Sequence, residues 1–162
     1  MSFVAIAFLA TLSASSQHGT HVHGSAELAI ALDQAGAIQI ELSAPAHDIY
    51  GFEHTAETAG EQAAIADANA RLSLKSGLIE LGEADCVLSD AQIERSDAAH
   101  GHGNVRVLYS GTCAHAERVR VVSTTLFDHF SRLSQIDGIL ISTHFQTVFE
   151  LTPASPSARL SR

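Results

Sequence analysis

Apolar and polar residues alternate along two neighbouring stretches near the start of the chain. From Ala26 to Leu32 and from Ile38 to Leu42, the even-numbered positions are apolar and most odd-numbered positions are polar or small. A period of two residues is typical of β-strands that bury one face. Because opposed residues share a face, we expect Leu32 opposite Ile38. Residues 34–36 then form a three-residue hairpin loop with its glycine in the left-handed conformation.

The same register, continued away from the loop, carries two histidine-containing stretches towards each other. It pairs Glu27 with Ser43 and places His23 opposite His47 on the polar, odd-numbered face. Pro45 has no amide hydrogen for the ladder, so the pairing is expected to break or to run along an edge before His47. The hairpin nevertheless predicts that the two stretches lie near each other.

A helix and a second hairpin are predicted in the middle of the chain. Thr58 and Glu61 form a capping box in front of the alanine-rich stretch 62–74, which is predicted to be helical. The stretches 86–93 and 105–113 have the composition of strands. A bulge is expected in the first of them, because its alternation fits that of the second poorly.

The last third of the chain is predicted to contain mostly strands. They are expected at residues 119–123, 136–144 and 146–151, with a short helix at 126–133. Pro153 and Pro156 are expected to end the ordered structure. The predicted fold class is therefore α+β, with antiparallel β-sheet in one or more sheets, one main helix and a short second helix.

The first residues have the composition of a secretory signal. Residues 1–14 are almost wholly apolar or small, small residues follow through Ser16, and the run is too short to span a bilayer. A buried N-terminal helix is the alternative, but the stretch is not amphipathic. We expect residues 1–16 to be a signal peptide and residues 17–162 to be a single exported metal-binding domain that is not inserted in the membrane.

Charge and cysteine content narrow the partners and the compartment. The formal net charge is −9 and lysine is nearly absent, which argues against nucleic acid as a partner. Cys86 and Cys113 are expected to form one disulfide in an oxidising compartment. Two free thiols, or two metal thiolates, are the alternative.

Histidines and carboxylates occur together in two short stretches. His21 and His23 lie two positions apart, so their imidazoles leave the same face of an extended backbone. The second stretch holds His47, Glu53 and His54. Neutral imidazole and carboxylate are ligands of Zn²⁺ and of neighbouring transition metals. These five residues are the predicted zinc ligands.

Other residues have more than one interpretation. Asp48 could bind the metal or orient an imidazole, and Glu53 or His54 could instead cap the following helix. Three further histidines are predicted to be secondary metal ligands: His18, His100 and His102. Three more are isolated in the sequence and are expected to be ordinary surface or core residues: His115, His129 and His144.

Several phrases of this sequence occur together in one known family. They are HVHG at 21–24, AHDIYGFEH at 46–54, YSGTC at 109–113 and LFDHF at 126–130, with Cys86 between the second and the third. Over roughly residues 17–151 the chain resembles the ZrgA-type periplasmic proteins of Gram-negative bacteria, which are associated with zinc uptake.

The resemblance implies a periplasmic zinc-binding protein without catalytic activity. Such a protein hands Zn²⁺ to an inner-membrane metal transporter or holds it in reserve. The resemblance also implies ligands at His21 and His23 and at Glu53 or His54. The family often has a long histidine-rich insert between its cysteines, which is reduced here to His100 and His102.

Other functions stay open on the sequence alone. A secreted metalloenzyme would activate a zinc-bound water with Glu53 or Asp48 as base, but the sequence contains no HExxH motif. A structural domain with incidental histidines is the third possibility. Imidazole also accepts copper and nickel, so the residue types do not decide the metal. Metal affinity without turnover would distinguish a binding protein from an enzyme.

A separate copper site is predicted if the signal peptide is cleaved after Ser15. The chain would then begin Ser16-Gln17-His18, whose amine, two backbone amides and third-position imidazole can bind Cu²⁺ or Ni²⁺ in a square plane. Calorimetry of this form should show a copper site that N-acetylation removes. Cleavage after Ser16 would abolish the site, and equal copper binding by the free and acetylated forms would contradict the prediction.

Overall fold

The computed structural model describes residues 22–74, 77–96 and 103–161. Its strands are β1 (Ser25–Leu32), β2 (Ala37–Pro45), β3 (Ile79–Leu81), β4 (Cys86–Leu88), β5 (Gln92–Ser96), β6 (Asn104–Cys113), β7 (Val121–Thr124), β8 (Gln135–Ser142), β9 (Gln146–Leu151) and β10 (Ser157–Arg159). Its helices are α1 (Ala46–Tyr50), α2 (Ala59–Leu72) and α3 (Leu126–His129), with a 3-10 turn at Ala116–Arg118.

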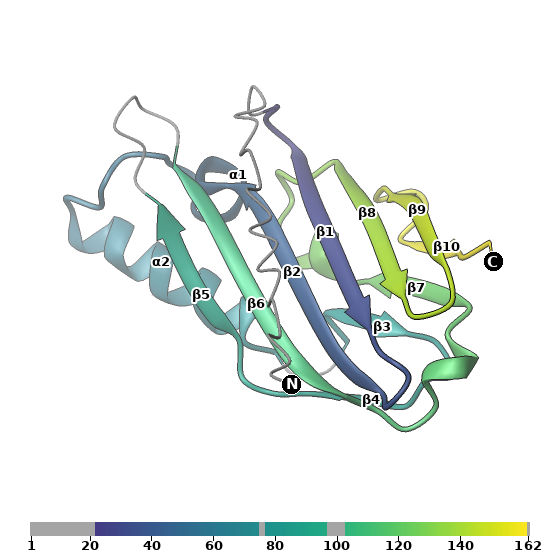
Figure 1. The fold of residues 1–162 in the computed structure, drawn as a ribbon. Helices are drawn as coiled ribbons and strands as arrows, with labels where there is room; N and C mark the ends of the chain where they lie inside the picture. Colours follow the sequence, from purple (N-terminus) through teal and green to yellow (C-terminus); the bar gives the residue numbers. More distant parts are fainter. Residues whose placement is uncertain (1–21, 75–76, 97–102, 162) are drawn as a thin grey trace, which may run out of the picture.

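Within these ranges the strands form two sheets (Figure 1). The large sheet has the order β4-β6-β2-β1-β8-β9, with β5 also paired to β6, and the small sheet has the order β10-β7-β3. Helix α2 and the small sheet lie on the same side of the large sheet. The fold is mixed α+β and predominantly β.

The first hairpin has the predicted register. Leu32 lies opposite Ile38 and Glu27 opposite Ser43 in the antiparallel pair β1–β2. Gly36 has φ of +86°, the left-handed conformation that the loop requires and that glycine adopts without a Cβ clash. The hairpin prediction is therefore confirmed, both in its pairing and in its turn.

The second hairpin is also present and contains the expected irregularity. Both β4 and β5 pair with β6. From Leu88 to Gln92 the chain advances four positions, while the partners on β6 differ by three, from Gly111 to Leu108. This extra residue is the predicted bulge. Cys86 and Cys113 lie opposite each other at the start of the pairing and are joined by a disulfide, as predicted.

Strand β8 lies beside β1 and runs parallel to it, which corrects the prediction of purely antiparallel sheets. Both strands bury their even-numbered side chains, so a parallel and an antiparallel arrangement would hide the same face. Periodicity therefore could not decide the direction. Strand β9 then pairs antiparallel with β8, and β7, β8 and β9 all lie within two residues of their predicted positions.

The chain remains ordered beyond Pro153 and Pro156, contrary to the prediction. Strand β10 pairs antiparallel with β7. Two backbone hydrogen bonds extend the contact, from Thr124 N to the Pro156 carbonyl at 3.0 Å and from Leu160 N to the Arg120 carbonyl at 2.9 Å. Both prolines precede the strand, so neither has to donate to its ladder.

Helix α2 begins at the predicted capping box and ends slightly early. The Thr58 hydroxyl accepts from Glu61 N, and the Glu61 carboxylate accepts from Thr58 N at 2.9 Å. The helix ends at Leu72 rather than at residue 74, and α3 ends four residues before its predicted end. Among the described residues, no helix is long and apolar enough to cross a membrane.

The core lies between the buried face of the large sheet, which holds the even-numbered residues of β1, β2 and β8, and the layer of α2 and the small sheet. Tyr109 of β6 is buried there, and its hydroxyl donates to the Leu72 carbonyl at 2.8 Å. Leu72 is the last residue of α2, so no N–H group of the helix donates to its carbonyl. Burial raises the pKa of Tyr109, which keeps the phenol protonated. This hydrogen bond fastens the end of α2 to the sheet.

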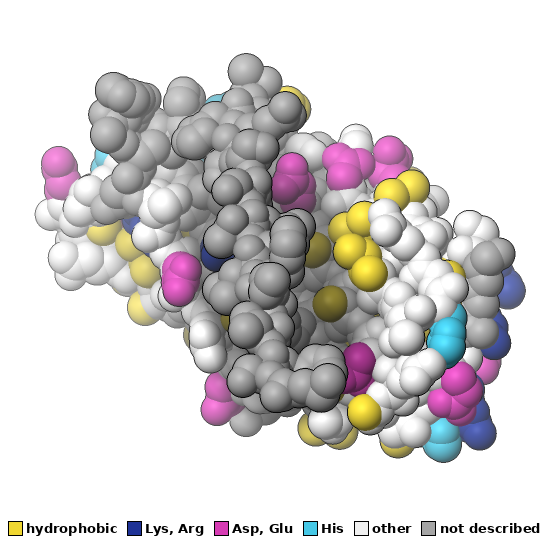
Figure 2. Space-filling view, viewed as in Figure 1, with side chains coloured by type: hydrophobic (Ala, Val, Ile, Leu, Met, Phe, Trp, Pro, Cys, Tyr) yellow, Lys and Arg dark blue, Asp and Glu magenta, His cyan; other side chains and the backbone are white. Residues whose placement is uncertain are grey.

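The opposite face of the large sheet carries acidic and apolar side chains over β1, β8 and β9 (Figure 2). The register places Glu27, Asp137 and Glu150 side by side in one row. On the same face of the sheet, further along β8 and β9, Val148 and Ile141 are exposed. The row lies towards the start of β1, close to the turn that holds His23.

We predict that Tyr109→Phe lowers the free energy of unfolding by about 1–2 kcal/mol, because the buried Leu72 carbonyl loses its hydrogen bond. Urea denaturation measures the change. Tyr50→Phe is the matched control, since the Tyr50 hydroxyl donates to Asn69 Oδ1 in a part-buried setting. A loss at Tyr109 no larger than the loss at Tyr50 would contradict the prediction.

Candidate metal centre

The centre begins in the turn in front of β1, which contains His23 and Gly24. Gly24 has φ of +84°, a left-handed conformation that is strained for other residues. Its carbonyl accepts from Ser134 N at 2.8 Å and from Gln135 N at 3.0 Å. His23 is thereby held where β1 and β8 begin side by side.

Asp48 fixes the same turn from the other side. Its Oδ2 accepts from Gly24 N at 2.7 Å, and its side chain is only 2% exposed. Buried polar groups are costly unless they are hydrogen-bonded, and a carboxylate with a backbone N–H donor is firmly held. Gly24 is therefore hydrogen-bonded on both sides: its carbonyl to the start of β8 and its amide to Asp48.

Helix α1 presents His47 and Asp48. The helix follows Pro45, the last residue of β2, and ends at Gly51, whose φ is +92° and whose N–H donates to the His47 carbonyl at 2.9 Å. It packs against β2, β6 and α2. The pairing of β1 with β2 ends at Glu27 and Ser43, so it breaks before His47 as expected. The chain turns into this helix directly after Pro45, and His47 therefore does not lie opposite His23 in the ladder.

His23, His47 and Asp48 nevertheless come together. One ligand atom from each lies within 4.8 Å of the others. The two imidazole centroids are 5.0 Å apart, and His47 Nδ1 lies 3.3 Å from Asp48 Oδ1. The side chains of His23 and His47 are 56% and 43% exposed. The group thus has a buried carboxylate at its base and two imidazoles that solvent can reach.

Glu53 adds a second carboxylate to the group. Its Oε1 lies 3.8 Å from His23 Nδ1, and its side chain is 15% exposed. The residue lies three positions after the end of α1, beyond Gly51, which has the left-handed conformation, and Phe52. The segment from His47 to Glu53 therefore supplies one imidazole and two carboxylates, because the chain turns at the end of α1.

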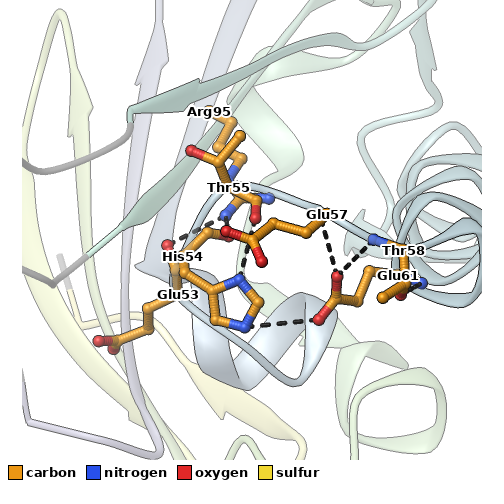
Figure 3. Close-up of polar contacts among 7 residues, drawn as sticks. All are labelled: Glu53, His54, Thr55, Glu57, Thr58, Glu61 and Arg95. Atoms are coloured by element: carbon orange, nitrogen blue, oxygen red, sulfur yellow. Dashed lines mark hydrogen bonds and ion pairs between the residues drawn. The ribbon is translucent and has the colours of Figure 1, made fainter.

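His54 lies on the other side of this segment (Figure 3). Its Nδ1 is 2.9 Å from the Thr55 carbonyl, and its Nε2 faces Glu61 Oε1 at 3.4 Å. Backbone N–H groups of Glu57 and Thr58 donate to Glu61 and lower the pKa of its carboxyl group. Glu61 is therefore an anion at neutral pH. The structure does not bring His54 together with His23 and His47.

The assembled donors suit a divalent transition metal. Two imidazoles and two carboxylates are the ligand types that Zn²⁺ takes in proteins. Asp48 is already fixed by the Gly24 amide, which is the kind of supporting hydrogen bond that orients metal ligands. The sequence left its role open between ligand and orienting group, and its position within the group fits direct coordination.

Four predicted ligands lie outside the described residues: His18, His21, His100 and His102. The structure does describe the residue that follows the segment containing the last two. Gly103 accepts a hydrogen bond from Ala46 N at 2.8 Å, and a Cβ at Gly103 would lie 2.8 Å from the Glu53 carbonyl. The backbone at Gly103 thus packs directly against the segment that carries the group.

The histidines that were expected to be ordinary lie elsewhere. His144 Nε2 is 2.8 Å from Gln34 Nε2, and His115 lies between Asp85 and Glu117 at 3.9 and 3.6 Å. Neither these nor His129 joins a metal-binding group within the part of the chain that the structure describes. What sequence reasoning missed is α1, since five residues give too short a pattern to detect.

A predominantly β fold with a His–His–Asp group defines a candidate metal-binding protein. A family model described as "ZrgA family zinc uptake protein" matches residues 20–160, a range that includes both sheets and the whole group. The chain belongs to this family, as the resemblance of its motifs predicted. No match was found among the curated proteins with which the chain was compared.

We predict that Gly24→Ala lowers the free energy of unfolding by about 1–3 kcal/mol, because the new Cβ is strained at this φ and lies 2.7 Å from Ser134 Oγ. Chemical denaturation of the metal-free protein measures the loss. Gly77→Ala is the matched control, since Gly77 has φ of +83° but no atom within 4 Å of the added Cβ. Only the backbone penalty of about 1 kcal/mol is expected there. Equal losses at the two positions would show that the contacts of Gly24 contribute nothing.

Proposed function

We propose that this protein binds Zn²⁺ through His23, His47, Asp48 and Glu53 and serves zinc acquisition in the periplasm. The observation that carries this proposal is the grouping of the first three residues within 4.8 Å of one another, from a turn and a helix that the fold holds in place. Membership of a zinc uptake family supports Zn²⁺ as the cargo. His21 is proposed as a further ligand, from its spacing to His23.

The four groups divide into two carboxylates that are largely buried and two imidazoles that are exposed. Asp48 is buried and held by the Gly24 amide, so it needs no rearrangement to accept an ion. His23 and His47 are exposed on the solvent side of the group. A preorganised carboxylate lowers the entropic cost of binding, while exposed imidazoles let the ion enter and leave.

Reversible binding without catalysis is the proposed activity. The exposed imidazoles would let a recipient protein take over coordination one ligand at a time, and an inner-membrane metal transporter is the proposed recipient. The acidic row of Glu27, Asp137 and Glu150, together with the net charge of −9, attracts cations towards this end of β1. The Cys86–Cys113 disulfide is consistent with an oxidising compartment such as the periplasm.

We predict that His23→Ala, His47→Ala and Asp48→Asn each weaken zinc binding by at least about tenfold, because each removes one of about four ligands. Competition with a chromogenic chelator, on the chain without residues 1–16, measures the affinity. His144→Gln is the control, since His144 contacts Gln34, which lies at the opposite end of β1 from His23.

His54→Gln decides which side of the Glu53–His54 segment binds the ion. We expect it to leave the affinity unchanged, because His54 faces Glu61. A loss at His54 without a loss at His47 would place the site on the other side of that segment. Unchanged affinity in all three ligand variants would refute the proposed function. Turnover of an ester or peptide substrate that depends on bound zinc would instead support the metalloenzyme alternative, and tighter retention of Cu²⁺ or Ni²⁺ from a metal mixture would reassign the cargo.

A further inference from the structure

Arg95 of β5 reaches across to the segment that carries Glu53. Its terminal nitrogen donates to the Glu53 carbonyl at 3.0 Å and also to the His54 carbonyl. Its guanidinium carbon lies 5.4 Å from the ring centroid of Tyr50 and 5.3 Å from that of Phe52. One side chain thus contacts the last residue of α1 and the next residues along the chain, by hydrogen bonds and by cation–π stacking.

The backbone of Glu53 is also confined by Gly103. A Cβ added to Gly103 would lie 2.8 Å from the Glu53 carbonyl. The carbonyl therefore lies between the guanidinium of Arg95 on β5 and the glycine that leads into β6. Since β5 and β6 are paired strands, the sheet itself sets the position of this peptide group.

This fixed backbone sends two adjacent side chains in opposite directions. In Figure 3 the Glu53 carboxylate leaves the segment on one side and the His54 ring on the other, while Arg95 approaches the backbone between them. Glu53 reaches His23 at 3.8 Å, and His54 reaches Glu61 at 3.4 Å. A rotation of this backbone would carry the Glu53 carboxylate away from His23.

We propose that Arg95 is a positioning residue for the zinc site, which holds the Glu53 backbone so that its carboxylate can coordinate the ion bound by His23, His47 and Asp48. This inference rests on the proposed function. Arg95 carries no lone pair and cannot itself be a ligand. Its hydrogen bond to the Glu53 carbonyl is the route by which it would act on zinc.

A lysine cannot replace this arginine. The guanidinium is planar, stacks on Tyr50 and Phe52, and directs its N–H groups at two carbonyls at once. An ammonium group is a compact, strongly hydrated charge without a planar face. Arg95→Lys thus keeps the charge near the site and removes the geometry.

A double-mutant cycle tests the proposal. Zinc affinity is measured for the chain without residues 1–16 and for Arg95→Lys, Glu53→Gln and the double variant. We expect Arg95→Lys alone to weaken zinc binding by about tenfold, the scale on which residues that orient metal ligands act. In the Glu53→Gln background the same change should have no further effect, because the carboxylate it positions is already gone. Arg106→Lys is the matched control: Arg106 lies on the neighbouring strand β6 and pairs with Glu41 at 2.6 Å.

The outcomes separate the two proposals. Failure of the unsubstituted chain to bind zinc would refute the proposed function. Equal losses from Arg95→Lys in both backgrounds would refute the positioning role, because a general effect on folding does not depend on Glu53. An unchanged affinity of Glu53→Gln would also refute it and would leave His23, His47 and Asp48 as the site. If Arg95→Lys does not fold, as judged by circular dichroism, Arg95→Gln replaces it in the same cycle with the same expected result.

Discussion

The hydrogen bond from the Gly24 amide to the Asp48 carboxylate joins the two halves of the candidate metal centre. Asp48 is almost completely buried, so the loss of its partner would leave a desolvated carboxylate at a cost of about 1–3 kcal/mol or more. Gly24 can donate to it only in a left-handed turn, whose carbonyl is held by the residues that lead into β8. Asp48 in turn reaches the turn only because β2 ends at Pro45 and the chain enters a helix. The location of the histidines follows from these constraints.

Rigidity is distributed unevenly around the group. Asp48 lies on a helix that packs against β2, β6 and α2, and Glu53 is fixed through its backbone by Arg95 and Gly103. The imidazoles of His23 and His47 are far more exposed than either carboxylate. The carboxylates of Asp48 and Glu53 thus lie on the inner side of the group, and the two imidazoles lie on its solvent side.

The local patterns of the sequence predicted much of the fold. Alternation gave the β1–β2 pairing and its turn, the Thr58–Glu61 box gave the start of α2, and the poor alternation after Cys86 gave the bulge. The parallel contact of β1 with β8 was beyond such reasoning, because both strands bury the same face in either direction. The strand β10 was not predictable, because its three residues are Ser, Ala and Arg and two prolines lie just before it.

Of the candidate site, the sequence predicted which residues come near each other but not the directions of all their side chains. The nearness of His23 and His47 was inferred from the hairpin register, with a break expected at Pro45, and it is confirmed although the chain enters α1 there. The opposite directions of Glu53 and His54 could not be inferred, since the backbone between them is held by Arg95, which lies 42 positions from Glu53. Residues that orient a site from a distant strand leave no local pattern in a sequence.

The parallel pairing of β1 with β8 has a consequence for the order in which the molecule assembles. β1 lies in the interior of the large sheet although it is the first strand of the described residues, and its neighbour β8 begins more than a hundred residues later. A chain synthesised from its N-terminus therefore carries a central strand without this neighbour until β8 has been made. Contacts between such distant segments form slowly. The carbonyl of Gly24 in the turn accepts hydrogen bonds from Ser134 and Gln135, so the turn that carries His23 is completed only after the residues that lead into β8 have been made.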